Sequence, residues 1–281
     1  MGVRIVTDST SDLPESTLKQ YGIEMVPLTV HFGPEAFLDS VEMDAGAFWA
    51  KLRTSPHHPK TAQPSPGDFL KVYEKLAGTG DEVISIHIST KLSGTMNSSQ
   101  IAAQMMPNLK VTHVDTRSAT WGLGMMAIEA SRMAKAGKST ESIVSAVEAI
   151  AQRMHIFFTL DTLEFLQKNG RIGKAQALLG GLLGIKPILQ VDREGVVAPA
   201  DKVRGKSKVL PRALEMMQER VPAGRRIKVA VLHTQVPDEA QRWLEAISKL
   251  YQIDESWFGE VGPVIATNTG PGTVGVCFYE V

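Results

Sequence analysis

The sequence predicts an α/β protein of two domains, each with a parallel or mixed sheet flanked by helices. Short apolar runs alternate with helical patterns along most of the 281 residues. Such alternation is typical of strands that lie side by side in one sheet. The length suffices for two domains with separate cores, and the composition changes near residue 155. We therefore expect domains at 1–155 and 156–281.

Strand and helix patterns follow one another in the first domain. Apolar runs lie at residues 3–6, 23–32, 81–89 and 111–114, and helical patterns lie at 14–21, 44–52, 66–76 and 98–106, with a long helix after 114 and a capped one from 138 to about 154. Residues 53–69 contain four prolines, which forbid a regular helix and favour an extended or exposed loop.

The second domain repeats the alternation with more turns. A strand, a short helix and a glycine stop are expected at 156–173, a β-hairpin at 190–205, helices at 207–220 and 238–250, and a strand at 227–234. From 255 to the end, strands alternate with glycine turns. A parallel or mixed sheet gathers ligands beyond the carboxyl ends of its strands. Asp8, Ser9, Ser93 and Asp115 are all expected at that edge.

Charge and cysteine usage exclude several classes of protein. Lys plus Arg (30) balance Asp plus Glu (30) without a long run of one sign, so a nucleic-acid partner is not expected. The single Cys277 cannot form an internal disulfide, and the first ten residues lack the layout of a signal peptide. A cytoplasmic protein is the expectation. The most apolar stretch, residues 177–189, is shorter than the roughly 20 residues of a bilayer span, so no integral membrane segment is expected.

A hydroxyl-rich turn is the strongest candidate site. Residues 89–99 read STKLSGTMNSS, and six of these eleven side chains carry a hydroxyl. Here a strand end, Gly94 and a helix start converge, so Ser93, Thr95 and the nearby backbone N–H groups point to an anion or carboxylate site. A helix cap alone explains one or two hydroxyls and explains six less well.

Other chemistries have weaker support. The letters GPGTVG at 270–275 match a dinucleotide fingerprint, but a terminal strand follows and Pro271 lacks a donor. Ser93 does not lie in a nucleophile elbow, and the scattered histidines lack zinc-ligand spacing. We therefore name neither catalytic residues nor a metal site. An alternative remains, a phosphotransfer enzyme that holds a magnesium nucleotide at Asp8 and Asp115.

Taken together, seven motifs resemble the DegV family of fatty-acid-binding proteins. They are VTDSTSDL, KTAQPSPGDF, STKLSGTMNSS, VDTRSATWGLG, LEFLQKNGRIG, GIKPIL and VGPVIATNTGPGTVGV, in the order of that family and over nearly the full chain. The resemblance implies a two-domain DegV-like fold with a long-chain fatty acid, such as palmitate, buried between the domains. It also implies a carrier rather than an enzyme, without a cofactor. A fatty acid kinase would be the partner, making acyl phosphate for phospholipid metabolism, and transient membrane contact is compatible with that role.

The resemblance assigns site residues by matching motifs. Thr61 and Ser93 match the hydroxyls that hold the carboxylate, and Gly94 and Thr95 complete the turn. The C-terminal motif adds Asn268 and Thr269, and two basic positions near the pocket mouth or partner surface are Arg171 and Arg204. The first domain is expected to carry the carboxylate-binding turn, and the second to enclose the acyl chain.

The chain departs from the family pattern at two positions. Ala62 stands where the family usually has a serine, and Asn268 stands where it usually has a histidine. Asn268 replaces a titratable group with an amide that still donates a hydrogen bond. Ligand binding can therefore persist, whereas phosphoryl transfer that depends on the histidine is less expected. The following side chains are candidates for the wall of the acyl tunnel: Leu163, Phe165, Leu166, Leu178, Leu179, Leu182, Leu183, Ile188, Met125 and Met126.

Overall fold

In the computed structural model, which describes residues 2–180 and 184–281, the chain forms two compact units. The first comprises Met1–Gln152 with Gly262–Val264, and the second comprises Arg153–Val261 with Ile265–Val281. The predicted boundary lies near residue 155, and the return of residues 262–264 to the first unit was not predicted. Within the described ranges, no helix is both long enough and apolar enough to span a bilayer.

The first unit is built on a parallel sheet. In spatial order its strands are β2 (Ile23–Val26), β1 (Val3–Asp8), β6 (Glu82–His87) and β7 (Val111–Asp115). Because all four run in the same direction, their carboxyl ends share one edge, where Asp8, His87 and Asp115 are the last strand residues. The expectation that Asp8 and Asp115 end strands at one edge is confirmed.

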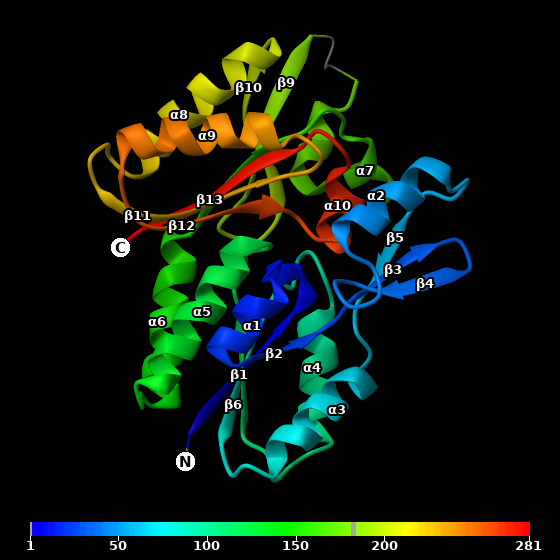
Figure 1. The fold of residues 1–281 in the computed structure, drawn as a ribbon, viewed down its shortest axis with the longest axis vertical. Coiled ribbons are helices and arrows are strands. Elements are labelled where there is room, and N and C mark those ends of the chain that lie inside the picture. The colour runs from blue at the N-terminus through cyan, green and yellow to red at the C-terminus, as the bar shows by residue number, and fades with distance from the viewer. Residues whose placement is uncertain (1, 181–183) are drawn as a thin grey trace. The chain divides into compact units, whose positions relative to one another are not determined.

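Helices cover both faces of this sheet (Figure 1). They are α1 (Glu15–Tyr21), α3 (Pro66–Ala77), α4 (Thr95–Gln104), α5 (Trp121–Lys135) and α6 (Thr140–Arg153). Helices α3 and α4 pack together, α4 on β6 and β7 and α3 on β2, while α5 packs on β1 and also contacts α1. Gly124 in α5 is required by this packing, because a Cβ there would lie 2.7 Å from the Ser11 carbonyl oxygen.

A small antiparallel sheet interrupts the alternation. It consists of β4 (Glu35–Leu38), β3 (Thr29–Phe32) and β5 (Lys60–Ala62), and α2 (Ala45–Thr54) follows β4. The apolar run 23–32 is therefore two strands, broken at Pro27. The proline-rich segment contains β5, which pairs Thr61 with Val30, so part of the expected loop is an edge strand.

The second unit contains a mixed sheet. Its order is β10 (Val197–Arg204), β9 (Ile185–Val191), β8 (His155–Thr159), β13 (Val274–Glu280), β11 (Arg226–His233) and β12 (Gln252–Glu260), with β11 and β12 parallel and the other pairs antiparallel. Figure 1 shows α8 (Val209–Arg220) and α9 (Pro237–Leu250) over one face. Trp243 of α9 and Phe157 and Phe278 of the sheet belong to the core that these helices cover. The predicted α/β class, with parallel and mixed sheets flanked by helices, is confirmed.

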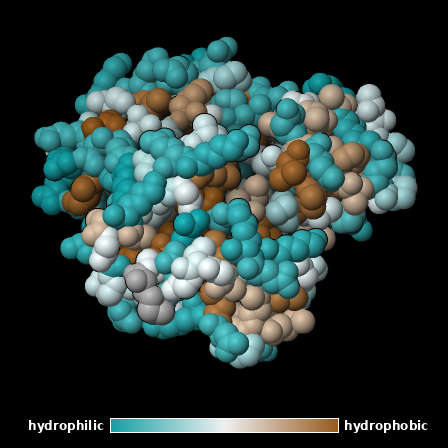
Figure 2. All heavy atoms as spheres, turned by 60° about the horizontal axis from the view of Figure 1, so that its bottom comes forward, coloured by the Kyte–Doolittle hydropathy of each residue, from teal (hydrophilic) through white to brown (hydrophobic). Residues whose placement is uncertain are grey.

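Besides the 3-10 helix η3 (Lys206–Lys208), the described part of the second unit has three further short helical segments. They are α7 (Glu164–Lys168), the 3-10 helix η2 (Gly173–Leu178) and α10 (Pro263–Thr269), whose first two residues belong to the first unit. The β9–β10 hairpin agrees with its prediction. Helix α10 differs from the prediction, because only strands and glycine turns are expected from residue 255 to the end. Hydrophilic residues dominate the face shown in Figure 2, where hydrophobic residues form separated patches.

Candidate functional site

The loop after β6 brings Ser93, Gly94 and Thr95 to the N-terminus of α4. The Oγ atoms of Ser93 and Thr95 lie 2.8 Å apart, and the Thr95 backbone N–H donates to Ser93 Oγ over 3.3 Å. Ser93 and Gly94 are half-buried, whereas Thr95 is fully buried. The first N–H groups of a helix lack intrahelical acceptors and carry partial positive charge. This turn is therefore suited to an anionic group.

The other hydroxyls of this segment have structural partners. Thr90 donates to Asp115 over 2.6 Å, Ser98 accepts from Gln63 over 3.0 Å, and Ser99 shares a hydrogen bond of 2.6 Å with Tyr73. Burial raises the pKa of Tyr73, so its hydroxyl stays protonated inside the fold. These hydroxyls therefore have roles within the fold, whereas the predicted carboxylate site uses Ser93 and Thr95. The hydroxyls of Thr90, Ser98 and Ser99 hold α4 and the loop in place.

The strand that carries Thr61 leads to the same turn. Gln63, two residues after Thr61, donates from Nε2 to Ser98 on the first turns of α4. A Cβ at Gly94 would overlap the Gln63 amide, so glycine permits this contact. Thr61 is half-buried and lies on β5. The structure thus brings the KTAQP segment against the turn through Gln63.

Asp8 occupies the carboxyl end of β1 and is fully buried. Its carboxylate accepts the backbone N–H groups of Thr10 (3.1 Å) and Ile88 (3.1 Å) and faces His87 Nδ1 at 2.9 Å. The other ring nitrogen of His87 lies 2.7 Å from Ser85 Oγ. This buried chain joins β1 to β6 immediately before the hydroxyl loop. Asp8 therefore fixes the strand ends from which the loop starts.

The magnesium alternative receives little support from this geometry. Asp115 accepts hydrogen bonds from the Thr90 hydroxyl and the Arg117 backbone N–H (2.9 Å). Asp8 already accepts two backbone N–H groups and faces His87. In the part of the chain that the structure describes, there is no group of three His, Cys, Asp or Glu residues arranged to hold a metal ion. Both carboxylates serve the fold by joining neighbouring segments.

The predicted residues of the C-terminal motif end α10 in the second unit. Asn268 and Thr269 are half-buried, and the Thr269 hydroxyl donates to the Ile265 carbonyl over 3.1 Å. Asn169 donates from Nδ2 to the Thr267 carbonyl over 2.9 Å, which fixes the last turn of the helix. Gly270 follows with φ of 70°, so the glycine-rich segment is a turn between α10 and β13.

The two predicted basic residues differ in their surroundings. Arg171 is half-buried and donates from a guanidinium nitrogen to the Asn169 carbonyl over 2.6 Å. Arg204 is exposed at the end of β10, where its register partner on β9 is Ile185. Arg171 therefore has a structural contact, whereas the side chain of Arg204 extends into solvent.

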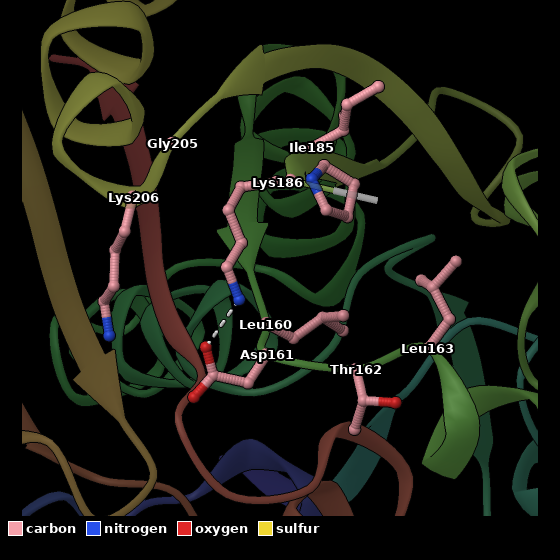
Figure 3. A pocket seen from close by; sticks show the side chains of 10 residues that line it. Leu160, Asp161, Thr162, Leu163, Ile185, Lys186, Gly205 and Lys206 are labelled. Carbon is pink, nitrogen blue, oxygen red and sulfur yellow. Dashed lines mark hydrogen bonds and ion pairs between the residues drawn. The ribbon is translucent and has the colours of Figure 1, made fainter. Parts of the chain in front are cut away.

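A pocket of about 270 Å³ lies within the second unit (Figure 3). Its walls are Leu160, Asp161, Thr162, Leu163, Gly184, Ile185, Lys186, Pro187, Gly205 and Lys206. Lys186 points to Asp161, with 2.8 Å between their charged atoms, and Lys206 pairs with Glu239 outside the pocket wall over 2.7 Å. The apolar walls of the pocket lie at the ends of β8 and β9. The pocket is suited to an apolar chain that enters beside polar groups.

The predicted tunnel residues have different locations. Leu163 lines this pocket, whereas Ile188 is buried in the core beneath α8 and α9. Met125 and Met126 are buried in α5 of the first unit. Leu182 and Leu183 lie outside the described residues. Leu160 and Pro187 are not among the predicted tunnel residues, because nothing in their local pattern distinguishes a pocket wall from a core residue.

Comparisons with known proteins cover the whole chain. Residues 2–281 match a family model described as "Uncharacterised protein, DegV family". A DegV domain-containing protein of Deinococcus radiodurans is 40% identical over 98% of both chains. Two solved structures superpose with TM-scores of 0.92 over 100% of both chains. One is a DegV family protein from Thermus thermophilus described for its fatty acid binding (38% identical), and the other is DegV from Bacillus subtilis, described as a fatty acid binding protein (34% identical).

Proposed function

Because the chain belongs to the DegV family, we propose that it binds a long-chain fatty acid such as palmitate and presents its carboxylate to a fatty acid kinase. The observation that carries the proposal is the Ser93–Thr95 hydroxyl pair at the start of α4. The relatives with solved structures that are described as fatty acid binding support it, since the likeness extends over both units.

In this proposal the carboxylate is held in the first unit. Thr61, Ser93, Gly94 and Thr95 provide hydroxyl and N–H donors without a cation. An ionised carboxylate that loses water without partners costs several kcal/mol or more, and charge-assisted hydrogen bonds offset about that amount. Asn268 and Thr269 supply further polar groups. The head of the ligand therefore determines its orientation.

The second unit encloses the acyl chain in this proposal. A buried methylene contributes about 0.8 kcal/mol, so about 14 of them give on the order of 11 kcal/mol before ordering costs. The pocket of about 270 Å³ offers Leu160, Leu163, Ile185 and Pro187 as apolar walls. Sites that enclose drug-sized ligands measure about 300–1,000 Å³, so this pocket matches part of the tail rather than all of it.

The role we propose is that of a cytoplasmic carrier whose partner does the chemistry. A kinase would phosphorylate the presented carboxylate, and the acyl phosphate would feed phospholipid synthesis. Exposed Arg204 is our candidate for partner recognition, and Arg171 for the pocket mouth. Neither residue takes part in a chemical step.

Lipid extraction tests the proposal. The protein is purified without added lipid and denatured, and the extract is examined by mass spectrometry for fatty acids. The stripped protein is then titrated with palmitate by calorimetry. We expect a co-purified long-chain fatty acid and one-to-one rebinding. An extract without fatty acid, together with no heat of binding, would refute the carrier role.

A further inference from the structure

Two aspartates converge on the segment by which the chain returns to the first unit. Asp12 follows the 3-10 helix η1 (Ser9–Ser11), and Asp39 follows β4. A Cβ built on Gly262 would lie 2.9 Å from Asp12 Oδ1 and 3.4 Å from Asp39 Oδ1. Both carboxyl groups thus face the same point of the backbone, directly before α10.

Hydrogen bonds connect each aspartate to this segment. The Gly262 backbone N–H donates to Asp12 Oδ1 over 3.0 Å, and the Val264 backbone N–H donates to Asp39. The Thr120 hydroxyl also donates to Asp12. The first turn of α10 is therefore anchored on the two carboxyl groups.

The surroundings disfavour two negative charges. Asp39 is fully buried, and its Oδ2 atom is without a hydrogen-bond partner among the described residues. Neither Asp12 nor Asp39 forms an ion pair within residues 2–180 and 184–281. A buried carboxylate without a cation is costly, so the neutral form is favoured.

The pKa values of the two aspartates also favour the neutral form. Burial, reinforced by the charge of Asp39, raises the pKa of Asp12 to about 8, and burial likewise raises the pKa of Asp39 to about 7. The charge of Asp8 adds to both shifts, while Asp8 itself faces His87. On the adjoining loop, exposed Glu42 accepts the Leu38 backbone N–H. The pair therefore titrates near neutrality as a coupled unit.

We propose that Asp12 and Asp39 are positioning residues for α10, and that they hold its first turn only while at least one of the two carboxyl groups carries a proton. Where it concerns ligand, the inference rests on the proposed function, because α10 ends in Asn268 and Thr269. Loss of the last proton places the charge of half-buried Asp12 beside that of fully buried Asp39. The carboxyl groups then separate, the N–H groups of Gly262 and Val264 lose their acceptors, and the helix start opens.

Amide hydrogen exchange on the protein without lipid tests the anchor. Protection factors of Gly262 and Val264 are measured from pH 6 to pH 9 after correction for intrinsic exchange. In the wild type we expect both protection factors to fall by about tenfold or more between pH 6 and pH 9. A tenfold change corresponds to one pKa unit. Asp39→Asn, which keeps the shape and cannot ionise, should hold protection constant. The exposed Asp238→Asn is the matched control and should behave as wild type. Constant wild-type protection across this range overturns the proposal.

Carboxyl-carbon NMR on wild type measures the protons directly. Signals assigned with Asp12→Asn and Asp39→Asn should show a titration midpoint above pH 6, and midpoints that both lie below pH 5 overturn the idea. Hydrogen exchange and carboxyl-carbon NMR require no ligand, so their outcome does not depend on the proposed function.

A palmitate titration at the same pH values tests the coupling to ligand. As the pH rises, the affinity for palmitate should decline more steeply in wild type than in Asp39→Asn. Because the fatty acid itself titrates equally in both experiments, the comparison removes its contribution. Equal slopes overturn the coupling to the end of α10. If neither protein binds palmitate at any pH, the proposed function fails while the exchange result still decides the anchor.

Discussion

Ser93 and Thr95 carry two hydroxyl protons between them and use one in their shared hydrogen bond of 2.8 Å. When buried Thr95 donates to half-buried Ser93, the Ser93 proton remains for another acceptor. In the proposed function, such a pair donates to the carboxylate without adding a positive charge. At the scale of single residues, this is the feature that separates Ser93 from Ser98 and Ser99, whose hydroxyls bond to side chains of the fold.

Replacement of Ser93 by alanine should weaken palmitate binding by about 1–3 kcal/mol, the usual cost of removing a partner from a buried charged group. Calorimetry on stripped protein measures the change. Thr90→Ala is the matched control, since it loses the hydrogen bond to Asp115 and should lower stability while leaving affinity unchanged. Equal affinities of wild type and Ser93→Ala would show that the carboxylate binds elsewhere.

His155 should make the second unit sensitive to acid. Burial, with the charges of Arg193 and Arg220, lowers the pKa of His155 to about 4, and its ring packs on Phe278 at 5.1 Å. Between about pH 6.5 and 4 the unfolded chain binds a proton that the folded chain does not. The free energy of unfolding should therefore fall as the pH falls through this window.

Urea unfolding at pH 7, 6, 5 and 4.5 checks this expectation. His155→Gln removes the titrating ring and should show a shallower loss of stability than wild type over the same range. Asp12 and Asp39 act in the opposite sense, since raised carboxyl pKa values cost stability as pH rises, and they do so equally in both proteins. Parallel pH profiles of wild type and variant would contradict the role given to His155.

The sequence predicts that the residues of the hydroxyl turn lie together, whereas it does not predict that Asp12 and Asp39 do. Ser93, Gly94 and Thr95 are neighbours in the chain, so a strand end and a helix start already place their groups together. Asp12, Asp39 and Gly262 are far apart in sequence, and their convergence depends on packing. A local pattern therefore predicts the first set and has no means of predicting the second.

At the scale of elements, the residue that follows β5, Gln63, contacts α4. The Gln63 amide lies where a Cβ of residue 94 would be, and it donates to Ser98 in α4. This contact requires glycine at 94 for space rather than for backbone freedom, since its φ is −81°. The position of β5, and of Thr61 on it, is thus tied to the first turns of α4.

Gly94→Ala should displace Gln63 and lower the free energy of unfolding by about 1 kcal/mol, the value of one hydrogen bond. In a Gln63→Ala background the same change should cost less, because the overlapping amide is gone. A double-mutant cycle by urea unfolding measures this coupling. Additive costs would show that Gly94 is needed for another reason.

Helix α10 shows why some elements were not predicted. Its sequence, Pro-Val-Ile-Ala-Thr-Asn-Thr, is rich in β-branched residues and reads as a strand. Proline at its first position permits a helix, and hydrogen bonds from distant segments then fix it. Asp12 and Asp39 hold the start, and Asn169 holds the end. Tertiary contacts override local propensity here, whereas long amphipathic helices such as α9 follow their pattern.

At the scale of the molecule, composition reveals two units but not how the chain passes between them. The change near residue 155 is visible because the first unit is continuous from its start to Gln152. Gly262–Val264 returns to the first unit because Asp12 and Asp39 accept its backbone N–H groups. The amino-acid composition of this segment does not indicate the return. In the proposed function, α10 therefore belongs to the ligand site at one end and to the anchor at the other.

Fatty acid should stabilise the whole molecule, and at a given concentration a tighter-binding fatty acid should stabilise it more. A ligand that binds only the folded state raises the free energy of unfolding by RT ln(1 + [L]/Kd), about 2.7 kcal/mol at 100 times Kd. Thermal unfolding of stripped protein with increasing palmitate should therefore shift to higher temperature, and Ser93→Ala should need about 5- to 150-fold more palmitate for the same shift, which is its predicted loss of affinity expressed as concentration. Thr90→Ala, which starts from a lower stability, should respond to palmitate as wild type does. If Ser93→Ala and wild type shift together, the tail alone determines binding and the hydroxyl turn has another role.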